Sequence, residues 1–405
     1  MTERLYYDDP RTLEFAARVT ERTTHHERPA VILDRTYFYP ESGGQLYDRG
    51  TLGGVNVVEV QIRDADHAVL HILERDLPTD ADSVEGRIDG ARRRDLTQHH
   101  SAQHILTAAL VKAAQAATVS VHMTLESMSI DVDRGPLAAA DLAAVEALAN
   151  EVVQSNLVVR CYWPDAADIP TLGLRKIPDV AGRLRVVEIG GFDVTACGGT
   201  HVERTGEIGL IKLVRQEKFK GGARIEFKAA GRALADYQMK NALAFQLAGE
   251  FNVPIMEVSG AVARLRDEAK ALRAEVKVLK KQVLDAEAVA LLAEATPFGA
   301  CRLTRLAFVE RPTDELNALA SRIASESGHI ALLGAAGAKC AFVFACAVDV
   351  PLDMVAALKA ALATLGVERG GGRPKLAQGG GVAASVAQIE TALDRAVEVL
   401  HGINL

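Results

Sequence analysis

The segment TQHHSAQHIL (97–106) places three histidines within ten residues. Residues 92–118 around it are rich in Ala and Leu, which predicts a helix. On a helix, His100 and His104 leave the same face one turn apart, so their imidazoles can share a metal ion. His99 points about 100° away from that face, and we leave it outside the metal set.

A second pair of metal-ligating side chains lies in DVTACGGTHVERTGEIG (193–209), where Cys197 and His201 repeat the three-residue gap. Each pair alone is a weak signal, because a helical histidine pair is more often a surface or core feature than a ligand set. Together the pairs offer three imidazoles and one thiol, a borderline-soft set that suits Zn²⁺. Four side-chain ligands would close the zinc tetrahedron, whereas an activated water needs an open or expanded position. The sequence leaves these two arrangements open.

Two other classes of zinc enzyme are disfavoured by the residues around these pairs. A metallopeptidase of the HExxH type needs a general-base Glu after its first histidine, and this chain has Ser101 there. A zinc deaminase needs a CxxC pair, and the five cysteines form none.

The composition bounds the architecture and the compartment. With 405 residues, 49% apolar and 24% charged, the chain can bury several domain cores. No apolar run approaches the roughly 20 residues of a membrane span, and the first residues do not resemble a signal peptide, so we expect a cytoplasmic protein without membrane contact. The five cysteines are too scattered for a disulfide framework. The formal charge of −7 does not by itself indicate nucleic-acid binding.

The chain is expected to be a multi-domain α+β protein. Residues 1–90 carry short apolar stretches between Gly, Asp and Pro clusters, which is typical of a small β-rich module. Residues 91–235 mix helical and strand-like patterns and hold both metal-ligating pairs, so we expect an α+β domain there. Residues 297–405 alternate strands with helices, which predicts a C-terminal α/β domain.

The region between these domains, residues 236–296, is predicted to be helical. Apolar residues recur there at alternating spacings of three and four, the pattern of a coiled-coil seam. The seam consists of Val262, Leu265, Ala269, Leu272, Val276, Leu279, Val283 and Ala286. It predicts either a homodimer or an intramolecular helical hairpin packed on residues 242–249, and we expect Pro297 to end the helix.

Six motifs occur in order along the chain: RTYFYPESGGQLYDRG (35–50), HSAQH (100–104), TVSVHM (118–123), TACGGTHVERTGEIG (195–209), KGGARIEF (220–227) and GGGRPKLAQGGG (370–381). Together they resemble the editing and C-terminal parts of alanyl-tRNA synthetase, and more closely its freestanding relatives, the AlaX trans-editing proteins in their long form. The resemblance implies a zinc-dependent hydrolase that deacylates tRNA(Ala) mischarged with serine or glycine. It also implies one Zn²⁺ per chain, held by His100, His104, Cys197 and His201.

The resemblance leaves several alternatives. The Gly-rich motif already begins at Tyr37, so we expect no ATP-using aminoacylation domain before it and no charging of tRNA. Within the hydrolase class, the alternative substrate is another small misacylated amino acid. From a different class, the alternative is a non-catalytic, zinc-stabilised module that binds tRNA.

The resemblance assigns three side chains to the reacting end of the substrate, namely Thr118, Gln45 and His122. Thr118 matches a threonine that recognises the serine hydroxyl, and such a contact favours serine because alanine would leave a buried polar group unpaired. The alternatives are a strand-start residue for Thr118 and a core histidine for His122. The Gly-rich motif (Ser42, Gly43, Gly44 and Gln45) is implied to pack against the editing domain and to support the rejection of serine, or else is an ordinary hairpin turn. Its first three residues are therefore candidate contacts with the substrate or the tRNA.

Local basic clusters predict contacts with tRNA phosphates. Residues 211–232 contain seven basic side chains against two glutamates, a local excess of five. Another basic cluster, residues 92–94, precedes the first histidine pair. From these clusters the candidate contacts are Arg92, Lys220 and Arg224.

The Gly-rich segment 370–381 surrounds Arg373 and Lys375. We expect a loop whose backbone amides approach phosphate, or else a structural turn before the last helix. The segment resembles the DHH-associated domain, which in the synthetase contributes to tRNA binding and self-association. It therefore adds these two residues to the tRNA contacts and offers a second route to a homodimer.

Overall fold

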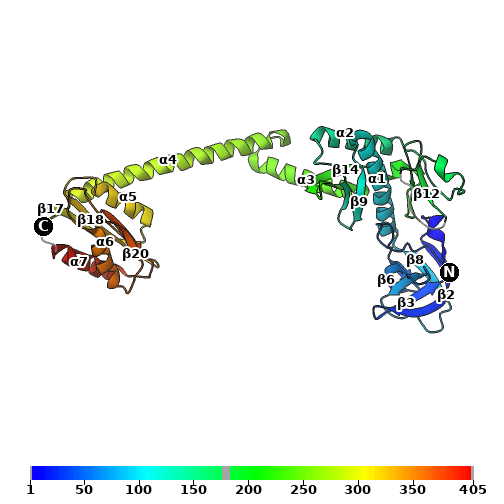
Figure 1. Cartoon of the computed structure of the whole chain (residues 1–405), viewed down its shortest axis with the longest axis horizontal. Helices are drawn as coiled ribbons and strands as arrows, with labels where there is room; N and C mark the ends of the chain where they lie inside the picture. The colour runs from blue at the N-terminus through cyan, green and yellow to red at the C-terminus, as the bar shows by residue number, and fades with distance from the viewer. Residues whose placement is uncertain (1, 176–182, 403–405) are drawn as a thin grey trace. The chain divides into compact units, whose positions relative to one another are not determined.

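The computed structural model describes residues 2–175 and 183–402. The chain divides into two compact units, residues 1–250 and 251–405, which are coloured blue to green and green to red in Figure 1. Both units combine helices with sheets, in agreement with the predicted multi-domain α+β class. The domain boundaries predicted at residues 90, 235 and 296 stay predictions.

The N-terminal part of the first unit is a closed barrel of six strands. In order around the barrel these are β2 (Glu14–His25), β3 (Arg28–Leu33), β7 (Val69–Leu73), β6 (Val55–Ile62), β5 (Gly50–Leu52) and β8 (Ser83–Ile88). Strand β8 alternates strictly between exposed and buried residues, as expected when one face of a strand lines a barrel interior. Leu33, Phe38 and Val60 are fully buried in this core. A short parallel pair, β1 (Glu3–Arg4) and β4 (Arg35–Thr36), lies beside the barrel.

The rest of the first unit holds two antiparallel sheets. The larger sheet has the order β14-β15-β10-β9, from strands β9 (Thr118–Met123), β10 (Met128–Val132), β14 (Ile211–Phe219) and β15 (Gly222–Ala229). The smaller sheet consists of β11 (Val159–Tyr162), β12 (Val186–Ile189) and β13 (Asp193–Ala196). Helices α1 (Gly90–Ala114) and α2 (Ala139–Gln154) share one hydrophobic core with both sheets.

Helix α1 carries the first histidine pair, and its ends are set by local chemistry. The Asp89 carboxylate accepts a hydrogen bond of 3.1 Å from the backbone N–H of Arg92, which caps the first turn. Gln115 follows the last turn in the left-handed conformation, with φ at 51°. The helix therefore ends at Ala114 rather than near Thr118, which instead opens strand β9.

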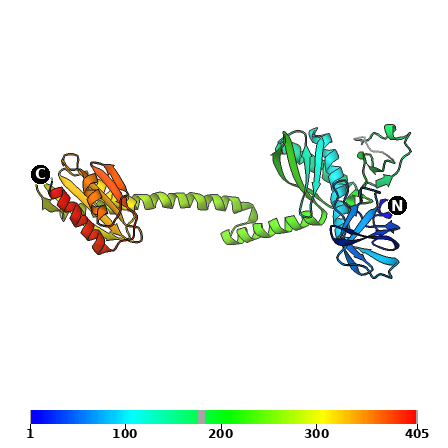
Figure 2. The ribbon, with the colours of Figure 1, turned by 60° about the horizontal axis from the view of Figure 1, so that its bottom comes forward.

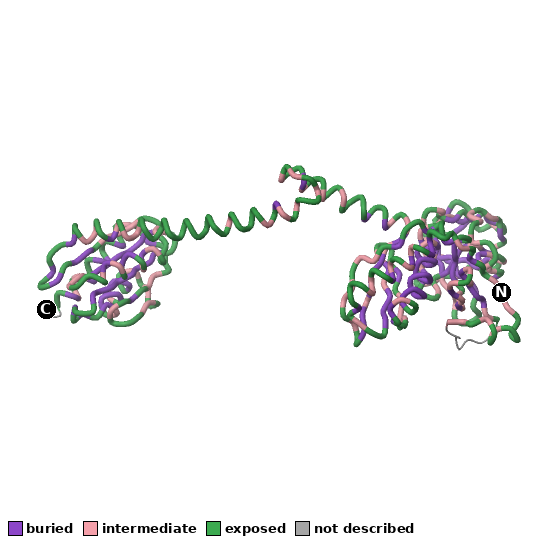
Figure 3. Tube along the Cα trace, turned by 90° about the horizontal axis from the view of Figure 1, so that it is seen from above, coloured by how far each residue is buried: buried purple, intermediate pink, exposed green. Residues whose placement is uncertain are grey.

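Two helices follow the sheets. Helix α3 (Ala230–Phe251) continues directly from β15, and a short 3-10 turn (Ile255–Glu257) precedes the 36-residue helix α4 (Val258–Ala293) of the second unit. The long helix predicted from the apolar seam is thus confirmed, and most of α4 is exposed (Figure 3). The helix ends at Ala293, four residues before Pro297. That proline lies in the edge strand β16 (Thr296–Phe298), where its missing N–H is tolerated.

No helix in residues 2–175 and 183–402 is both long and apolar enough to cross a membrane.

The second unit is a six-stranded sheet covered by helices on both faces (Figure 2). The sheet order is β16-β17-β18-β19-β21-β20, with β17 (Cys301–Val309), β18 (His329–Ala336), β19 (Ala341–Cys346), β20 (Gly370–Arg373) and β21 (Leu376–Gly380). One core lies between the sheet, the end of α4 and α5 (Thr313–Ile323), and the other between the sheet, α6 (Met354–Ala363) and α7 (Val386–His401). Strands β18 and β19 are buried on both sides, which explains their continuous apolar sequences.

Residues 370–381 form a hairpin and not the predicted loop, and their contact with phosphate stays a prediction. Strands β20 and β21 pair as an antiparallel hairpin, so most backbone amides of the segment serve the sheet. Two of the glycines are needed because α6 packs on the hairpin: a Cβ on Gly370 would lie 2.3 Å, and one on Gly379 2.6 Å, from Cδ1 of Leu362. Arg373 is exposed at the turn, and the Lys375 ammonium donates to the Val350 carbonyl oxygen.

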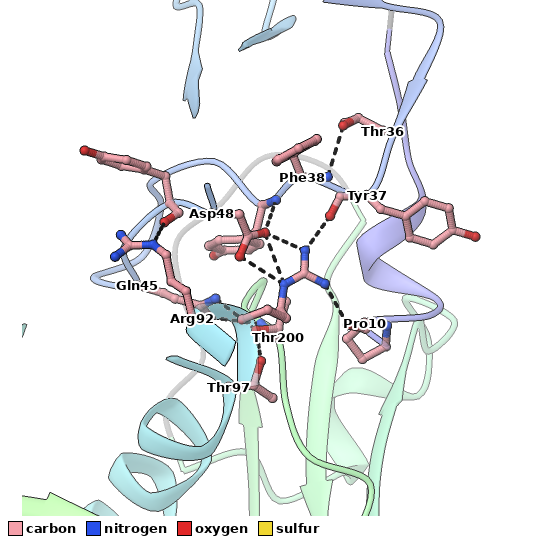
Figure 4. Close-up of polar contacts among 12 residues, drawn as sticks. Pro10, Thr36, Tyr37, Phe38, Gln45, Asp48, Arg92, Thr97 and Thr200 are labelled. Carbon is pink, nitrogen blue, oxygen red and sulfur yellow. Dashed lines mark hydrogen bonds and ion pairs between the residues drawn. The ribbon is translucent and has the colours of Figure 1, made fainter. Parts of the chain in front are cut away.

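A buried ion pair joins α1 to the barrel. Arg93 and Asp48 have side chains that are only 3% and 1% exposed, and Nη2 of Arg93 lies 2.5 Å from Oδ2 of Asp48. The same guanidinium donates to the carbonyl oxygens of Pro10 and Tyr37, and the Asp48 carboxylate also accepts from the backbone N–H of Tyr39 (Figure 4). The middle residue of the basic cluster 92–94 is therefore a structural link and is not available to phosphate.

We expect Asp48→Asn to lower the free energy of unfolding of the first unit by about 3–5 kcal/mol, because it leaves a guanidinium charge buried without a counterion. Urea denaturation followed by circular dichroism measures this difference. The matched control is Glu14→Gln, which breaks the exposed pair with Arg87 on the same barrel. A loss no larger for Asp48→Asn than for Glu14→Gln would contradict this account.

Candidate metal centre

Four side chains from two distant segments converge in the first unit. Three of them, His100, His104 and His201, are buried, and Cys197 is partly buried. Their candidate ligand atoms all lie within 4.8 Å of one another. Nε2 of His100 is 3.2 Å from Nε2 of His104 and 3.5 Å from Sγ of Cys197, and Nε2 of His201 is 3.3 Å from the same sulfur. This cluster could hold a metal ion.

The chain brings these residues together through α1 and the loop after β13. His100 and His104 are separated by one helical turn and face the same side of α1, as the sequence predicts. Cys197 and His201 lie on the loop that leaves β13, and the Arg185 guanidinium fixes this loop. It donates to the carbonyl oxygens of Cys197 and Gly199, at 3.0 and 2.9 Å. The sequence analysis missed Arg185, which lies in a strand-like run with no motif of its own.

Gly199 allows the loop to approach the helix. A Cβ at this position would lie 2.1 Å from Cε1 of His100 and 2.8 Å from Oε1 of Gln45. Any side chain would displace the imidazole, so the second glycine of the CGGTH motif is required by the close contact.

Gln45 orients the first histidine. Its Oε1 lies 2.6 Å from Nδ1 of His100 and also accepts from the backbone N–H of Thr200 at 3.0 Å. Its amide group donates to the Thr200 hydroxyl, which contacts the Thr97 hydroxyl at 2.7 Å (Figure 4). Because an amide oxygen only accepts, the network assigns the proton to Nδ1 of His100 and leaves Nε2 free as a ligand.

Ser101 orients His201 in the same way as Gln45 orients His100. The Ser101 hydroxyl donates to the Thr97 carbonyl oxygen at 2.9 Å and accepts from the backbone N–H of Val202 at 3.1 Å. It lies 3.2 Å from Nδ1 of His201. Since the hydroxyl proton is committed to Thr97, Nδ1 of His201 is the donor and Nε2 faces the cluster. Ser101, which argues against a metallopeptidase, therefore positions the His201 ring in this protein.

Burial holds the four side chains neutral in the absence of a metal. It lowers the pKa of His100 to about 4, with a smaller effect of Arg185, and lowers the pKa values of His104 and His201 well below the ordinary value. It raises the pKa of the Cys197 thiol to about 11, against the opposing hydrogen bond from the Gly199 N–H. Neutral imidazole is the form that ligates a metal, and a bound cation would favour the thiolate.

The Gly-rich motif presents Gln45 to the cluster. Ser42 and Gln45 exchange backbone hydrogen bonds across a tight turn, in which Gly43 and Gly44 have left-handed φ angles of 59° and 84°. Gln45 is fully buried, whereas the two glycines are exposed. The structure thus places Gln45 against Nδ1 of His100, whereas the candidate ligand atom of His100 is Nε2 on the other side of the ring.

Thr118 contacts helix α1 one turn from His104. It is half-buried at the start of β9, and its Oγ1 lies 3.4 Å from Oγ1 of Thr107. Thr107 is one turn from His104 on α1 and accepts a hydrogen bond of 2.8 Å from the Gln103 side chain. Among residues 2–175 and 183–402 the Thr118 hydroxyl therefore has one long contact, and it can donate to another group instead.

His122 belongs to a different group of side chains. Its Nε2 lies 3.0 Å from the Asp131 carboxylate, and the His122 side chain is 51% exposed. The same carboxylate accepts from the Ser120 hydroxyl and from Arg224. The hydrogen bonds of the described residues do not connect His122 to the metal-ligating cluster.

Most of the predicted phosphate contacts are engaged within the protein. Five of the seven basic residues in 211–232 form ion pairs with carboxylates, many of them distant in sequence: Lys212 with Glu146, Arg215 with Glu217 and Glu226, Arg224 with Asp131, Lys228 with Asp236, and Arg232 with Asp95. Lys220 is exposed at the β14–β15 turn. Arg92 donates through Nε to the Tyr47 carbonyl oxygen. Carboxylates from outside residues 211–232 therefore compensate most of the excess of five positive charges in this segment.

Comparison with known families gives two partial matches. The family described as the threonyl and alanyl tRNA synthetase second additional domain matches residues 184–226, which include Cys197 and His201. The family of class II (A) tRNA synthetases matches residues 3–92, which cover the barrel.

Curated relatives match almost the whole chain. The alanine–tRNA ligases of Halorubrum lacusprofundi and Methanothermobacter thermautotrophicus are each 32% identical over 99% of this chain, which covers 44% and 45% of those proteins. The ligase of Thermococcus kodakarensis is 33% identical over 93% of this chain and 41% of its own length. The chain thus spans less than half the length of these relatives.

Among solved structures, the C-Ala domain of Aquifex aeolicus alanyl-tRNA synthetase matches 26% of this chain and 96% of its own, with 24% identity and a TM-score of 0.24. Thermus thermophilus RecJ in complex with Mn²⁺ matches 39% of this chain and 26% of its own, with 22% identity and a TM-score of 0.25. The sequence matches are the informative ones, and by them the chain is related to the alanyl-tRNA synthetases over almost its whole length.

Proposed function

We propose that the chain is a zinc-dependent deacylase that removes serine or glycine from mischarged tRNA(Ala) in trans. The buried cluster of three imidazoles and one thiol supports this best, because two of its members lie in the match to the synthetase second additional domain. The relation to alanine–tRNA ligases supports tRNA(Ala) as the partner. We propose hydrolysis and not ligation because the motifs of this chain resemble those of the editing proteins.

The spacing of the ligand atoms suits zinc. Tetrahedral zinc bonds of about 2.0–2.3 Å separate neighbouring nitrogen and sulfur ligand atoms by roughly 3.3–3.6 Å. Three of the six separations among the cluster atoms are 3.2, 3.3 and 3.5 Å, and all six are within 4.8 Å. His100, His104, Cys197 and His201 would therefore hold the ion after the more distant of these atoms move closer together.

The chemistry that zinc supplies when bound is polarisation of an ester carbonyl or acidification of a water molecule. The protein's own residues hold Nε2 of His100 and His201 toward one point through Gln45 and Ser101. Burial of the cluster limits the water that surrounds the reacting ester and strengthens polar contacts with it.

We assign selection of the amino acid to Thr118. Its hydroxyl is held near α1 by one long contact with Thr107, so it can exchange that contact for the hydroxyl of a seryl group. An alanyl group offers no such partner and would leave the Thr118 hydroxyl less well satisfied. His122 is proposed only as an outer contact, since it is bound to Asp131 at the surface.

For tRNA phosphates, we retain Lys220 and Arg92 as contacts near the first unit and Arg373 at the second. A homodimer through the seam of α4 is supported by its exposed apolar residues, such as Leu265 and Leu272, each 53% exposed. The alternative function, a non-catalytic tRNA-binding module, would keep the same cluster as a closed structural zinc site.

The first test combines zinc stoichiometry with serine release from Ser-tRNA(Ala), using Ala-tRNA(Ala) and a chelated sample as controls. We expect one zinc per chain, fast serine release, and loss of release on chelation. Cys197→Ala should lower zinc content and serine release at least tenfold, whereas Cys340→Ala, at a buried cysteine of the second unit, should change neither. One bound zinc without hydrolysis of either substrate would favour the binding module.

Gln45→Leu is expected to weaken zinc binding about 10–100-fold, because it removes the acceptor that fixes His100. Competition with a chromogenic chelator measures the affinity. Gln61→Leu is the matched control, since this glutamine on the barrel strand β6 donates to Glu59. Equal zinc affinity of the Gln45→Leu and wild-type proteins would show that the His100 contact does not matter.

Thr118→Val should lower the rate of serine release about tenfold while leaving the slow release of alanine unchanged, because only the seryl hydroxyl loses a partner. Parallel deacylation of Ser-tRNA(Ala) and Ala-tRNA(Ala) measures the ratio. A variant that loses both rates equally, or neither, would exclude Thr118 as the selecting residue.

A further inference from the structure

A pocket of about 650 Å³ lies in the first unit, outside the metal-ligating cluster. Its size is in the range of pockets that hold small molecules or parts of larger ligands. The wall combines aromatic rings with charged groups of both signs. The rings belong to Tyr7 and Trp163, the cations to Arg4 and Arg183, and the anions to Glu3 and Asp8.

Trp163 and Tyr7 form the aromatic part of the wall. Their ring centroids are 5.5 Å apart and their planes are perpendicular, at 90°. The guanidinium carbon of Arg183 lies 5.6 Å from the centroid of the Trp163 ring. Both rings are half-buried, so each is held by the protein and still has surface to offer. Rings beside an arginine are the platform on which proteins stack the bases of single-stranded nucleic acid.

A buried hydroxyl group of the same wall has no partner. Thr2 lines the pocket and is 5% exposed. Its Oγ1 has no hydrogen-bond partner within residues 2–175 and 183–402. Buried polar atoms are nearly always hydrogen-bonded, so this hydroxyl favours a ligand that supplies a donor or an acceptor.

The charges of the wall favour a base over a phosphate. Its two guanidinium groups are balanced by two carboxylates, so the wall has no net positive charge to attract phosphate. The Arg4 guanidinium is also engaged, because it donates to the His67 carbonyl oxygen at 2.7 Å. The edge of a nucleobase, in contrast, carries donors and acceptors side by side, which suits a wall with groups of both kinds.

Tyr7 connects the pocket to the loop of the metal-ligating cluster. Its carbonyl oxygen accepts from Nη2 of Arg185 at 3.0 Å, and the same guanidinium donates to the Cys197 carbonyl oxygen. A Cβ added to Gly198, the residue after Cys197, would lie 3.7 Å from the Tyr7 hydroxyl oxygen. The Tyr7 side chain therefore lines the pocket and also contacts the ligand loop.

We propose that this pocket binds the base of an unpaired nucleotide, stacked on Trp163 and hydrogen-bonded to Thr2. In the proposed deacylation the nucleotide belongs to the single-stranded 3′ end of the tRNA, whose last residue carries the ester. The choice of tRNA as the source rests on the proposed function, whereas the binding of a base does not. A free nucleotide offers the same chemistry and is the other source to test.

Trp163 is the single tryptophan of the chain, so intrinsic tryptophan fluorescence reports on this pocket alone. The full chain is titrated with an unacylated RNA minihelix that ends in four unpaired nucleotides. We expect saturable quenching, because a base stacked on the indole changes its emission. The same minihelix with a blunt end should not quench, and neither should ribose 5-phosphate, which has a phosphate but no base.

Two outcomes of the titration would contradict the proposal. Equal quenching by the blunt minihelix, or no quenching by either the overhang or AMP, would exclude a base-binding pocket. Quenching by AMP at lower concentrations than by the overhang would identify a free nucleotide as the ligand and overturn the assignment to tRNA.

Variants test the two contacts separately, through the anisotropy of a labelled overhang minihelix. Trp163→Leu should weaken binding about 5–100-fold, the effect of losing one stacked base. Thr2→Val should weaken it about 2–10-fold without lowering the stability of the protein, since the hydroxyl has no partner in the free protein. The matched control is Tyr237→Leu, at a tyrosine of α3 that is 62% exposed, and it should change neither quantity.

Unchanged affinity in both Trp163→Leu and Thr2→Val would overturn the proposal. If Trp163→Leu does not fold, Thr2→Val and the wild-type titration decide it. The binding measurements use unacylated RNA and require no hydrolysis. Serine release without quenching would therefore contradict this inference alone, and quenching without serine release would contradict the proposed function alone.

Discussion

One carboxamide holds the candidate site together. Oε1 of Gln45 accepts from Nδ1 of His100 on α1 and from the backbone N–H of Thr200 on the loop after β13, while Gln45 itself comes from the turn of the Gly-rich motif. Three segments of the chain therefore meet at one fully buried oxygen atom. Because that oxygen can only accept, it fixes both the ring orientation and the tautomer of His100. The convergence of the four metal-ligating side chains depends on this contact.

Two buried arginines extend the same arrangement. Arg93 joins the start of α1 to Asp48 and to the carbonyl oxygens of Pro10 and Tyr37. Arg185 joins the loop of Cys197 to the N-terminal segment, where it donates to the Tyr7 carbonyl oxygen at 3.0 Å. A planar guanidinium with five donors suits such junctions, because it can satisfy several carbonyl oxygens at once. The barrel is thereby a structural support of the metal-ligating cluster.

The charge counted along the sequence did not predict the charge of the protein surface. Residues 211–232 have a local excess of five positive charges, yet Arg224 is paired with Asp131 and Arg232 with Asp95. These carboxylates lie on other strands and helices, so a count along one segment cannot include them. The glycines of residues 370–381 were misread for a related reason. Gly370 and Gly379 permit close packing of α6 on a hairpin, and a glycine looks the same in sequence whether a helix or a phosphate approaches it.

The sequence by itself determined the local features: the helix that carries His100 and His104, the strand segments with their alternating burial, the long helix α4, and the two pairs of ligand-type side chains. These follow from spacing and periodicity, which are properties of neighbouring residues. Only the tertiary structure decided which polar groups meet. The partners of His100, His201 and Arg93 come from segments far away in the chain, and hydrogen-bond pairing across such distances leaves no periodic signal. For the same reason the sequence marked Gln45 as part of a motif but did not show that it contacts His100 instead of a substrate.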